Sequence, residues 1–173
     1  MIEILAPGIR YDSDTKGYIM LDVGRVIPEL RSTEKNGVKL LPKAEFHCSI
    51  VAARDLSDGN PELEALIVET TKASLHRVPI KVTGLSGAYY ICKETKDGDA
   101  TQTTVIGGLE TSSLDDLHKS LQKIVPTYQP FIPHVTLLKS QNSKYGIGVN
   151  SQTDLEKLCR RDNQLATQIV KHK

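Results

Sequence analysis

Two short apolar segments of the chain each carry a histidine followed two positions later by a hydroxyl residue. The first segment is "AEFHCSIVA", with His47 and Ser49, and the second is "FIPHVTLL", with His134 and Thr136. An imidazole gains and loses a proton near neutral pH, and a hydroxyl can donate a hydrogen bond to an anionic oxygen. Two such pairs in one chain therefore favour general acid–base chemistry beside hydrogen-bond donors.

Both segments have the composition of β-strands, in which residues two apart project from the same face and their neighbours from the other. The spacing predicts that His47 and Ser49 share one face, while Cys48 points to the packed face. His134 and Thr136 stand in the same relation in the second segment. We therefore expect each strand to offer one imidazole and one hydroxyl to a common surface.

A third triplet of the same pattern, "HKS" at His118, lies in a segment with helical periodicity. Residues two apart in an α-helix diverge by about 200°, so His118 and Ser120 cannot serve one site together. The triplet alone is weak evidence, whereas its occurrence on two apolar strands favours a shared site. We expect His76 and His172 to lie outside this site.

The rest of the chain predicts both helices and strands, with hairpins more frequent than regular strand–helix alternation. We expect strands at residues 2–11, 17–26, 78–94 and 101–110, a polar loop at 31–43, and helices beginning near residues 60, 113 and 153, the last reaching residue 169. This order favours an α+β fold with antiparallel sheets.

The expected helices have recognisable start signals. Asn60 precedes a proline at the first helical position, which is typical of an N-cap. Ser113 and Asp116, and likewise Thr153 and Glu156, have the spacing of a capping box. These signals predict where the three helices begin.

Length and charge limit the partners of the protein. The chain has 173 residues and a formal net charge of +1, which suits a single domain spanning residues 1–173. Binding of duplex DNA or of a long RNA helix rests on many phosphate contacts from a basic face. The near-neutral charge therefore favours a small ligand over long RNA or duplex DNA, and we expect a monomer.

The cysteines and the hydropathy indicate the compartment. Cys48, Cys92 and Cys159 are widely separated and odd in number, so they predict no disulfide framework and are read as small buried apolar residues. The N-terminal residues lack the features of a signal peptide, and no run reaches the roughly 20 apolar residues of a membrane span. These features predict a cytoplasmic protein without a membrane partner.

The two motifs, in a chain of this size, resemble those of the 2H phosphoesterase superfamily. That group includes RNA 2′,3′-cyclic phosphodiesterases, historically called 2′–5′ RNA ligases. "PFIPHVTLLK" is especially similar to the second motif of the bacterial branch, in which a proline precedes the histidine and a basic residue, here Lys139, follows five positions after it. Many relatives of that branch have an arginine shortly before this motif, where the present chain has Tyr128 and Gln129.

The resemblance implies a fold, an activity and a set of site residues. The fold would be bilobal and pseudo-symmetric, with two antiparallel sheets lining a central groove, helices outside, and one motif from each lobe. His47 and His134 would be the catalytic pair of a metal-independent phosphodiesterase, and Ser49 and Thr136 would bind the substrate phosphate. The favoured substrate is a nucleotide or RNA-derived 2′,3′-cyclic phosphate, and no cofactor is expected.

Three further residues are candidates for substrate binding. Lys139 could add a positive charge to the phosphate site. The chain has no tryptophan and only two phenylalanines, so stacking on a base would fall largely to tyrosines. Tyr128 and Tyr145 lie close to the second motif in the sequence and are the tyrosines that we single out.

Other functions remain open at this point. Other members of the 2H superfamily hydrolyse 2′–5′-linked oligoadenylates or cyclic oligonucleotide signals, and nothing in the sequence selects between these substrates. A catalytically silent module that binds a nucleotide or RNA is a different class of function. Zinc binding is disfavoured, because two distant histidines without an acidic or thiolate third ligand make a poor zinc site.

Overall fold

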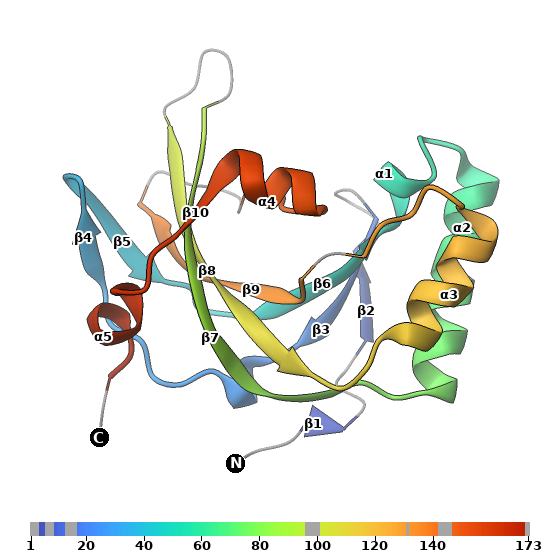
Figure 1. Ribbon diagram of the computed structural model, residues 1–173, viewed down its shortest axis with the longest axis horizontal. Coiled ribbons are helices and arrows are strands. Elements are labelled where there is room, and N and C mark those ends of the chain that lie inside the picture. Colours follow the sequence, from blue (N-terminus) through green and yellow to red (C-terminus); the bar gives the residue numbers. More distant parts are fainter. Residues whose placement is uncertain are drawn as a thin grey trace.

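The computed structural model describes residues 4–5, 9–12, 17–95, 101–130, 132–141 and 147–171. It contains two antiparallel sheets and several helices (Figure 1), so the predicted α+β class with antiparallel sheets is confirmed. The larger sheet is strongly curled and has the order β1-β7-β8-β9-β5-β4, with β10 also paired to β7. The smaller sheet has the order β2-β3-β6.

The bounds of the strands are as follows. The larger sheet comprises β1 (Ile4–Leu5), β4 (Thr33–Lys35), β5 (Val38–Pro42), β7 (Lys81–Glu94), β8 (Gln102–Thr111), β9 (His134–Ser140) and β10 (Cys159–Arg161). The smaller sheet comprises β2 (Ile9–Asp12), β3 (Tyr18–Asp22) and β6 (His47–Ala52). The two histidine motifs therefore lie in different sheets, the first in β6 and the second in β9.

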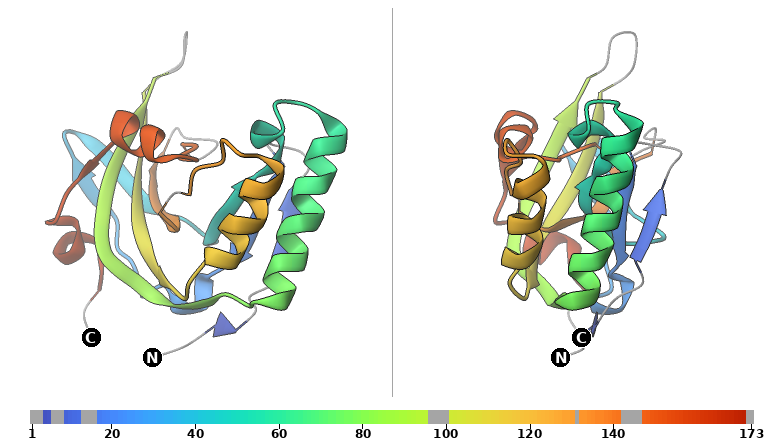
Figure 2. Two further views of the ribbon diagram at one scale, coloured as in Figure 1. Left: turned by 45° about the vertical axis from the view of Figure 1, so that its right-hand side comes forward. Right: turned by 90° about the vertical axis from the view of Figure 1, so that its right-hand side faces the viewer.

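The helices cover different parts of these sheets. They are η1 (Gly24–Val26), α1 (Ala53–Leu56), α2 (Pro61–Arg77), α3 (Asp115–Ile124), α4 (Gln152–Leu158) and α5 (Leu165–Ile169). The helices α2 and α3 lie side by side at one side of the molecule, whereas α4 lies within the curve of the larger sheet (Figure 2). Among the described residues, no helix is both long enough and apolar enough to cross a membrane.

The predicted hairpins at the start and in the middle of the chain are confirmed. β2 pairs with β3, and β7 pairs with β8, both in antiparallel register. The turn at residues 13–16 and the turn at 96–100 lie outside the described residues. The side chains of Ile19 and Leu21 are buried in the main core, and Met20 on the opposite face of β3 is buried as well.

The predicted loop at residues 31–43 is wrong, because it contains the hairpin of β4 and β5. Its turn is formed by Asn36 and Gly37, whose φ angles are 51° and 78°. An Asn-Gly pair with positive φ at both positions is the preferred two-residue turn between antiparallel strands. The prediction followed the polar composition of the segment and overlooked this turn signal.

The start of α2 is as predicted, whereas the proposed capping box of α3 is wrong. The side chain of Asn60 accepts hydrogen bonds from the first turn of α2. Ser113 accepts a hydrogen bond from the backbone N–H of Asp115. Asp116 instead accepts hydrogen bonds from Ser74 at 2.6 Å and Arg77 at 2.8 Å, both on α2. Because the carboxylate finds a charged partner on a neighbouring helix, it joins α2 to α3 and does not cap its own helix.

The last predicted helix, from residue 153 to residue 169, is interrupted. The helix α4 is capped by Ser151, which accepts from the N–H of Asp154 at 3.0 Å, and it ends at Leu158. The next three residues form β10, and α5 follows after a turn. Pairing with β7 gives the backbone of β10 inter-strand hydrogen bonds in place of helical ones, and this tertiary pairing overrides the helical periodicity.

The strand β10 places Cys159 directly opposite Cys92, and the two residues form a disulfide. The prediction that no disulfide forms is therefore wrong, and it failed for the same reason as the predicted helix, because β10 was not foreseen. Cys48 is free and buried, as expected. Disulfides are more usual in oxidising compartments, so the cytoplasmic location stays a prediction.

We expect the Cys92–Cys159 link to stabilise the fold substantially. It joins residues 67 positions apart, and a disulfide that restricts the unfolded chain typically contributes about 2–4 kcal/mol. Urea denaturation of Cys159→Ala should show a free energy of unfolding lower by this amount, and reductant should bring the wild-type protein close to the same value. A thiol titration that finds three free cysteines in untreated protein would contradict the link itself.

Candidate functional site

The first motif strand, β6, shows the predicted alternation of burial. Cys48 and Ile50 are buried in the main core, whereas His47 and Ser49 are half-buried. The second motif strand behaves in the same way over its first half. Val135 is buried, and His134 and Thr136 are half-buried. Each strand thus presents its imidazole and its hydroxyl on the face that is not packed into the main core.

Both motif strands carry an irregularity of the same kind at the same position. In the pairing of β3 with β6 the register shifts by one residue, and Ile50 is the extra residue on β6. In the pairing of β8 with β9 the register also shifts, and Leu137 is the extra residue on β9. Each extra residue directly follows the hydroxyl residue of its motif. Such bulges bend a strand and redirect the side chains that follow.

The bulge in β9 determines on which face of the sheet Lys139 lies. Thr136 is paired with Ile106 and Lys139 with Thr104. Paired residues lie on the same face of a sheet, and Ile106 and Thr104 are two apart on β8, so Thr136 and Lys139 share a face. In a regular strand their odd spacing would have placed them on opposite faces. The bulge therefore brings the candidate cation to the face that carries His134.

The two motif strands lie against each other although they belong to different sheets. The backbone N–H of Lys43, between β5 and β6, donates to the carbonyl oxygen of Leu137 at 3.0 Å. Further along, the sulfur of Cys48 lies in hydrogen-bonding range of the backbone of His134. The fold thus places the second histidine beside the residue that follows the first one.

The motif faces of both sheets are turned toward the segment that precedes α4. On the smaller sheet, Tyr18 lies on the same face as Ser49, and its hydroxyl oxygen accepts a hydrogen bond from the side chain of Asn150 at 3.2 Å. On the larger sheet, His134 lines a small cavity together with Ser151. The consecutive residues Asn150 and Ser151 therefore lie next to the motif faces of the smaller and the larger sheet, respectively.

The ring of His134 is held in one orientation by the backbone. Its Nδ1 lies 2.8 Å from the carbonyl oxygen of Ile132. A carbonyl only accepts, so Nδ1 carries a proton, and Nε2 holds the lone pair of the neutral ring. Burial lowers the pKa of His134, and the bond to Ile132 partly offsets this effect. A neutral imidazole with a defined lone pair suits a general base.

His47 has a different polar neighbour. Its Nε2 lies 3.3 Å from a carboxylate oxygen of Glu45, whose side chain is 74% exposed. The carboxylate accepts a hydrogen bond from Nε2, so this nitrogen carries a proton. An ion pair as exposed as this one adds little to stability, and the contact serves to orient the ring. The Nε2–H of His47 thus provides a hydrogen-bond donor at the first motif.

We expect the burial of His134 to make stability depend on pH. The pKa in the folded protein is below the ordinary 6.5, so the unfolded chain binds this proton more readily. The contribution of neutral His134 to the free energy of unfolding is therefore complete above pH 6.5 and is lost as the pH falls below that value. In urea denaturation at about pH 7.5 and pH 5, two values that bracket the titration of histidine, His134→Gln should lose less stability than the wild type.

His118 provides the comparison for this experiment. Burial lowers its pKa as well, with partial compensation by Asp115, so His118→Gln should also flatten the pH dependence. The double variant should be flatter than either single one. If the stability of His134→Gln falls with pH as much as that of the wild type, the imidazole of His134 is as easily protonated in the folded protein as in the unfolded chain.

A second lysine, which sequence reasoning missed, lies beside Lys139. Leu41 on β5 is paired with Lys139 on β9. Lys43 follows Leu41 by two residues and therefore lies on the same side of the extended chain. Burial lowers the pKa of Lys43, the charge of Lys139 lowers it further, and Glu45 partly offsets both effects. The two lysines therefore form a local positive site close to the first motif. No motif marks Lys43, and only the pairing of β5 with β9 reveals its place.

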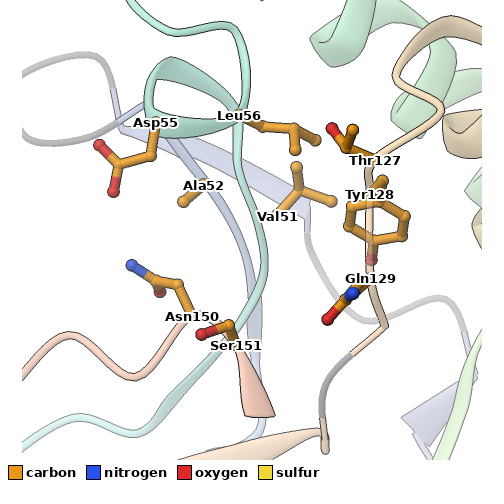
Figure 3. Close-up of a pocket in the computed structure, with 9 residues that line it drawn as sticks. All are labelled: Val51, Ala52, Asp55, Leu56, Thr127, Tyr128, Gln129, Asn150 and Ser151. Carbon is orange, nitrogen blue, oxygen red and sulfur yellow. The ribbon is translucent and has the colours of Figure 1, made fainter. Parts of the chain in front are cut away.

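A cavity of about 270 Å³ adjoins the end of the first motif strand, β6 (Figure 3). It is lined by the end of β6, by α1, by residues 127–129 and by Asn150 with Ser151. Tyr128 is 7% exposed and forms part of the wall, and burial raises its pKa to about 12. Tyr145 lies outside the described residues.

Neither metal binding nor similarity to known proteins adds to this site. The described part of the chain contains no group of three or more histidine, cysteine, aspartate or glutamate side chains arranged to hold a metal ion. Comparison of the chain with protein-family models, curated proteins and solved structures finds no match in any of the three.

Proposed function

We propose that this protein is a metal-independent phosphodiesterase of the 2H type, which opens a nucleotide or RNA-derived 2′,3′-cyclic phosphate to a monoester. The observation that carries the proposal is the side-by-side placement of two His-x-Ser/Thr strands, each with a bulge directly after its hydroxyl residue. The equivalent bulges at Ile50 and Leu137 also support a pseudo-symmetric relation between the two sheets.

The environments of the two imidazoles support different roles. In this scheme neutral His134 takes a proton on Nε2 from a water molecule whose oxygen forms the new bond to phosphorus. The bond between phosphorus and one ribose oxygen breaks, and protonated His47 gives its proton to that leaving oxygen. One proton is taken up and one is released, so the step is balanced. A well-placed acid or base contributes roughly 10²–10⁴ in rate.

The hydroxyls and lysines hold the phosphate in this scheme. Ser49 and Thr136 donate hydrogen bonds to the non-bridging oxygens, whose negative charge must be stabilised as the pentavalent transition state forms. Lys139 shares the face of Thr136 and adds a positive charge.

A second substrate class is favoured by one specific observation. Lys43 and Lys139 are close enough for one charge to lower the pKa of the other, and an additional phosphate between them would relieve this repulsion. Substrates with more than one phosphate, such as 2′–5′ oligoadenylates or cyclic oligonucleotide signals, would supply that group. We therefore retain hydrolysis of these compounds as the alternative.

The proposal is tested with a panel of substrates whose products are resolved by mass. The panel contains 2′,3′-cyclic mononucleotides, RNA with cyclic phosphate ends, 2′–5′ and 3′–5′ oligonucleotides, and cyclic oligonucleotides. We expect turnover that persists in EDTA and yields a monoester from a cyclic phosphate. Saturable binding without turnover of any compound would overturn the proposal and favour a silent binding module. Activity that disappears in EDTA and returns with a divalent ion would overturn the metal-independent mechanism.

A further inference from the structure

The cavity beside the end of β6 carries a further inference. Val51 and Ala52 belong to the strand that carries the first motif, and residues 127–129 shortly precede the second. Ser151 lines this cavity and also the small cavity that contains His134. A ligand whose phosphate lies between the two histidines would therefore have its neighbouring group at the mouth of this cavity.

The dimensions of the cavity suit one small ring system. Its volume of about 270 Å³ lies just below the range of about 300–1,000 Å³ that is usual for pockets binding drug-sized ligands. Val51, Leu56 and Tyr128 supply apolar surface, and Figure 3 shows Leu56 and Val51 between the Asp55 side and the Tyr128 side. A flat aromatic group of a nucleotide fits such a space, whereas a chain of nucleotides does not.

The charge of the cavity argues against a phosphate inside it. Asp55 is the one charged residue among the nine that line it in Figure 3. A carboxylate repels phosphate but accepts hydrogen bonds from N–H groups, and it has about four acceptor positions. Asp55 can thus serve a ligand in addition to its partners in the protein. The phosphate must remain outside the cavity, at the histidines and lysines.

Further polar side chains line the cavity, namely the amides of Asn150 and Gln129 and the hydroxyls of Thr127 and Ser151. Asn150 is held in place by its bond to Tyr18 and by a hydrogen bond of 2.9 Å from its backbone N–H to Asp154. Gln129 lies across the cavity from Asp55 (Figure 3). Amide groups can both donate and accept. The cavity therefore has the carboxylate of Asp55 on one side and the amide of Gln129 on the other, whereas the amide of Asn150 lies on the side of Asp55 and donates to Tyr18.

We propose that this cavity is a subsite for the nucleobase of the substrate and that it prefers guanine. Guanine presents two adjacent N–H donors, which one carboxylate can accept together, and a carbonyl oxygen for an amide donor. Uracil places a single N–H between two carbonyl oxygens, which Asp55 would repel. Adenine and cytosine each offer one amino group and should be intermediate. The inference rests on the proposed function for the position of the phosphate.

The experiment compares the four 2′,3′-cyclic mononucleotides on wild-type protein. One good bidentate pair discriminates against a wrong base by roughly tenfold or more, so we expect kcat/KM to be at least that much higher for the guanosine compound than for the uridine compound. In Asp55→Asn this preference should shrink by about the same factor, with little change for uridine. Asp58→Asn is the matched control, because Asp58 is three residues away, does not line the cavity, and has a φ of 52° that asparagine tolerates.

A binding measurement separates this inference from the proposed function. Calorimetry with guanosine and uridine 3′-monophosphates, and with inorganic phosphate as the probe without a base, requires no turnover. A guanosine preference that Asp55→Asn abolishes, in protein that hydrolyses nothing, would support the subsite and overturn the phosphodiesterase. Hydrolysis of all four compounds with equal kcat/KM would overturn the subsite and leave the phosphodiesterase intact. The comparison of bases on wild-type protein needs no variant, so misfolding of Asp55→Asn would not prevent either result.

Discussion

His47→Ala and His134→Ala should each lower kcat on a 2′,3′-cyclic phosphate by roughly 10²–10⁴, the contribution of one general acid or base. The reason is that the two rings perform different tasks, and neither can replace the other. His134 has its Nδ1–H bound to the carbonyl oxygen of Ile132, which fixes the tautomer of the neutral ring with its lone pair on Nε2. His47 has its Nε2–H directed at the carboxylate of Glu45, which orients the ring.

The matched control is His76→Ala, because His76 is an exposed histidine on α2, outside the candidate site. Its kcat should equal that of the wild type. Circular dichroism and urea denaturation should show that all three variants are folded. Full turnover by either motif variant, in protein shown to be free of wild-type contamination, would contradict the paired-histidine mechanism.

Loss of the two hydroxyls should have the second largest effect. Ser49→Ala and Thr136→Val should each lower kcat by about 10², the lower end of the effect of removing one oxyanion donor, and the double variant should lose more. Thr136→Val preserves the shape of the side chain and its strand preference. Both hydroxyls lie on the half-buried faces of the motif strands, so their removal should leave the fold unchanged.

Thr104→Val provides the control for this pair of variants. Thr104 is fully buried on β8, and its hydroxyl has no hydrogen-bond partner among the described residues. Because an unsatisfied buried hydroxyl is costly, this variant should be at least as stable as the wild type and fully active. Equal kcat in Thr136→Val and Thr104→Val would mean that the hydroxyl of the second motif takes no part in the reaction.

The parts of the fold that were predicted correctly are those with strong local signals. Asn60 followed by a proline marks the start of α2, and alternating burial marks the motif strands. The errors arise where tertiary pairing prevails over local pattern. The segment around Cys159 has helical periodicity but pairs with β7 as β10, and the disulfide follows from that pairing. The β4–β5 hairpin could have been predicted from Asn36 and Gly37.

The candidate site was predictable in its centre but not at its edges. Strand parity is sufficient to place His47 with Ser49 and His134 with Thr136. It fails for Lys139, because a register shift at Leu137 reverses the parity and nothing in the sequence marks that shift. The cavity and its polar lining likewise depend on three segments that are distant in the chain.

The central claim is that the imidazoles of His47 and His134 act on one phosphorus atom. It is tested most directly by a crystal structure of the protein with guanosine and vanadate, which together mimic the pentavalent transition state. We predict one vanadate with oxygens roughly 2.6–3.2 Å from a ring nitrogen of each histidine, the reach of a proton transfer. A vanadate bound to one ring alone, with the other ring held by protein groups away from it, would contradict the account.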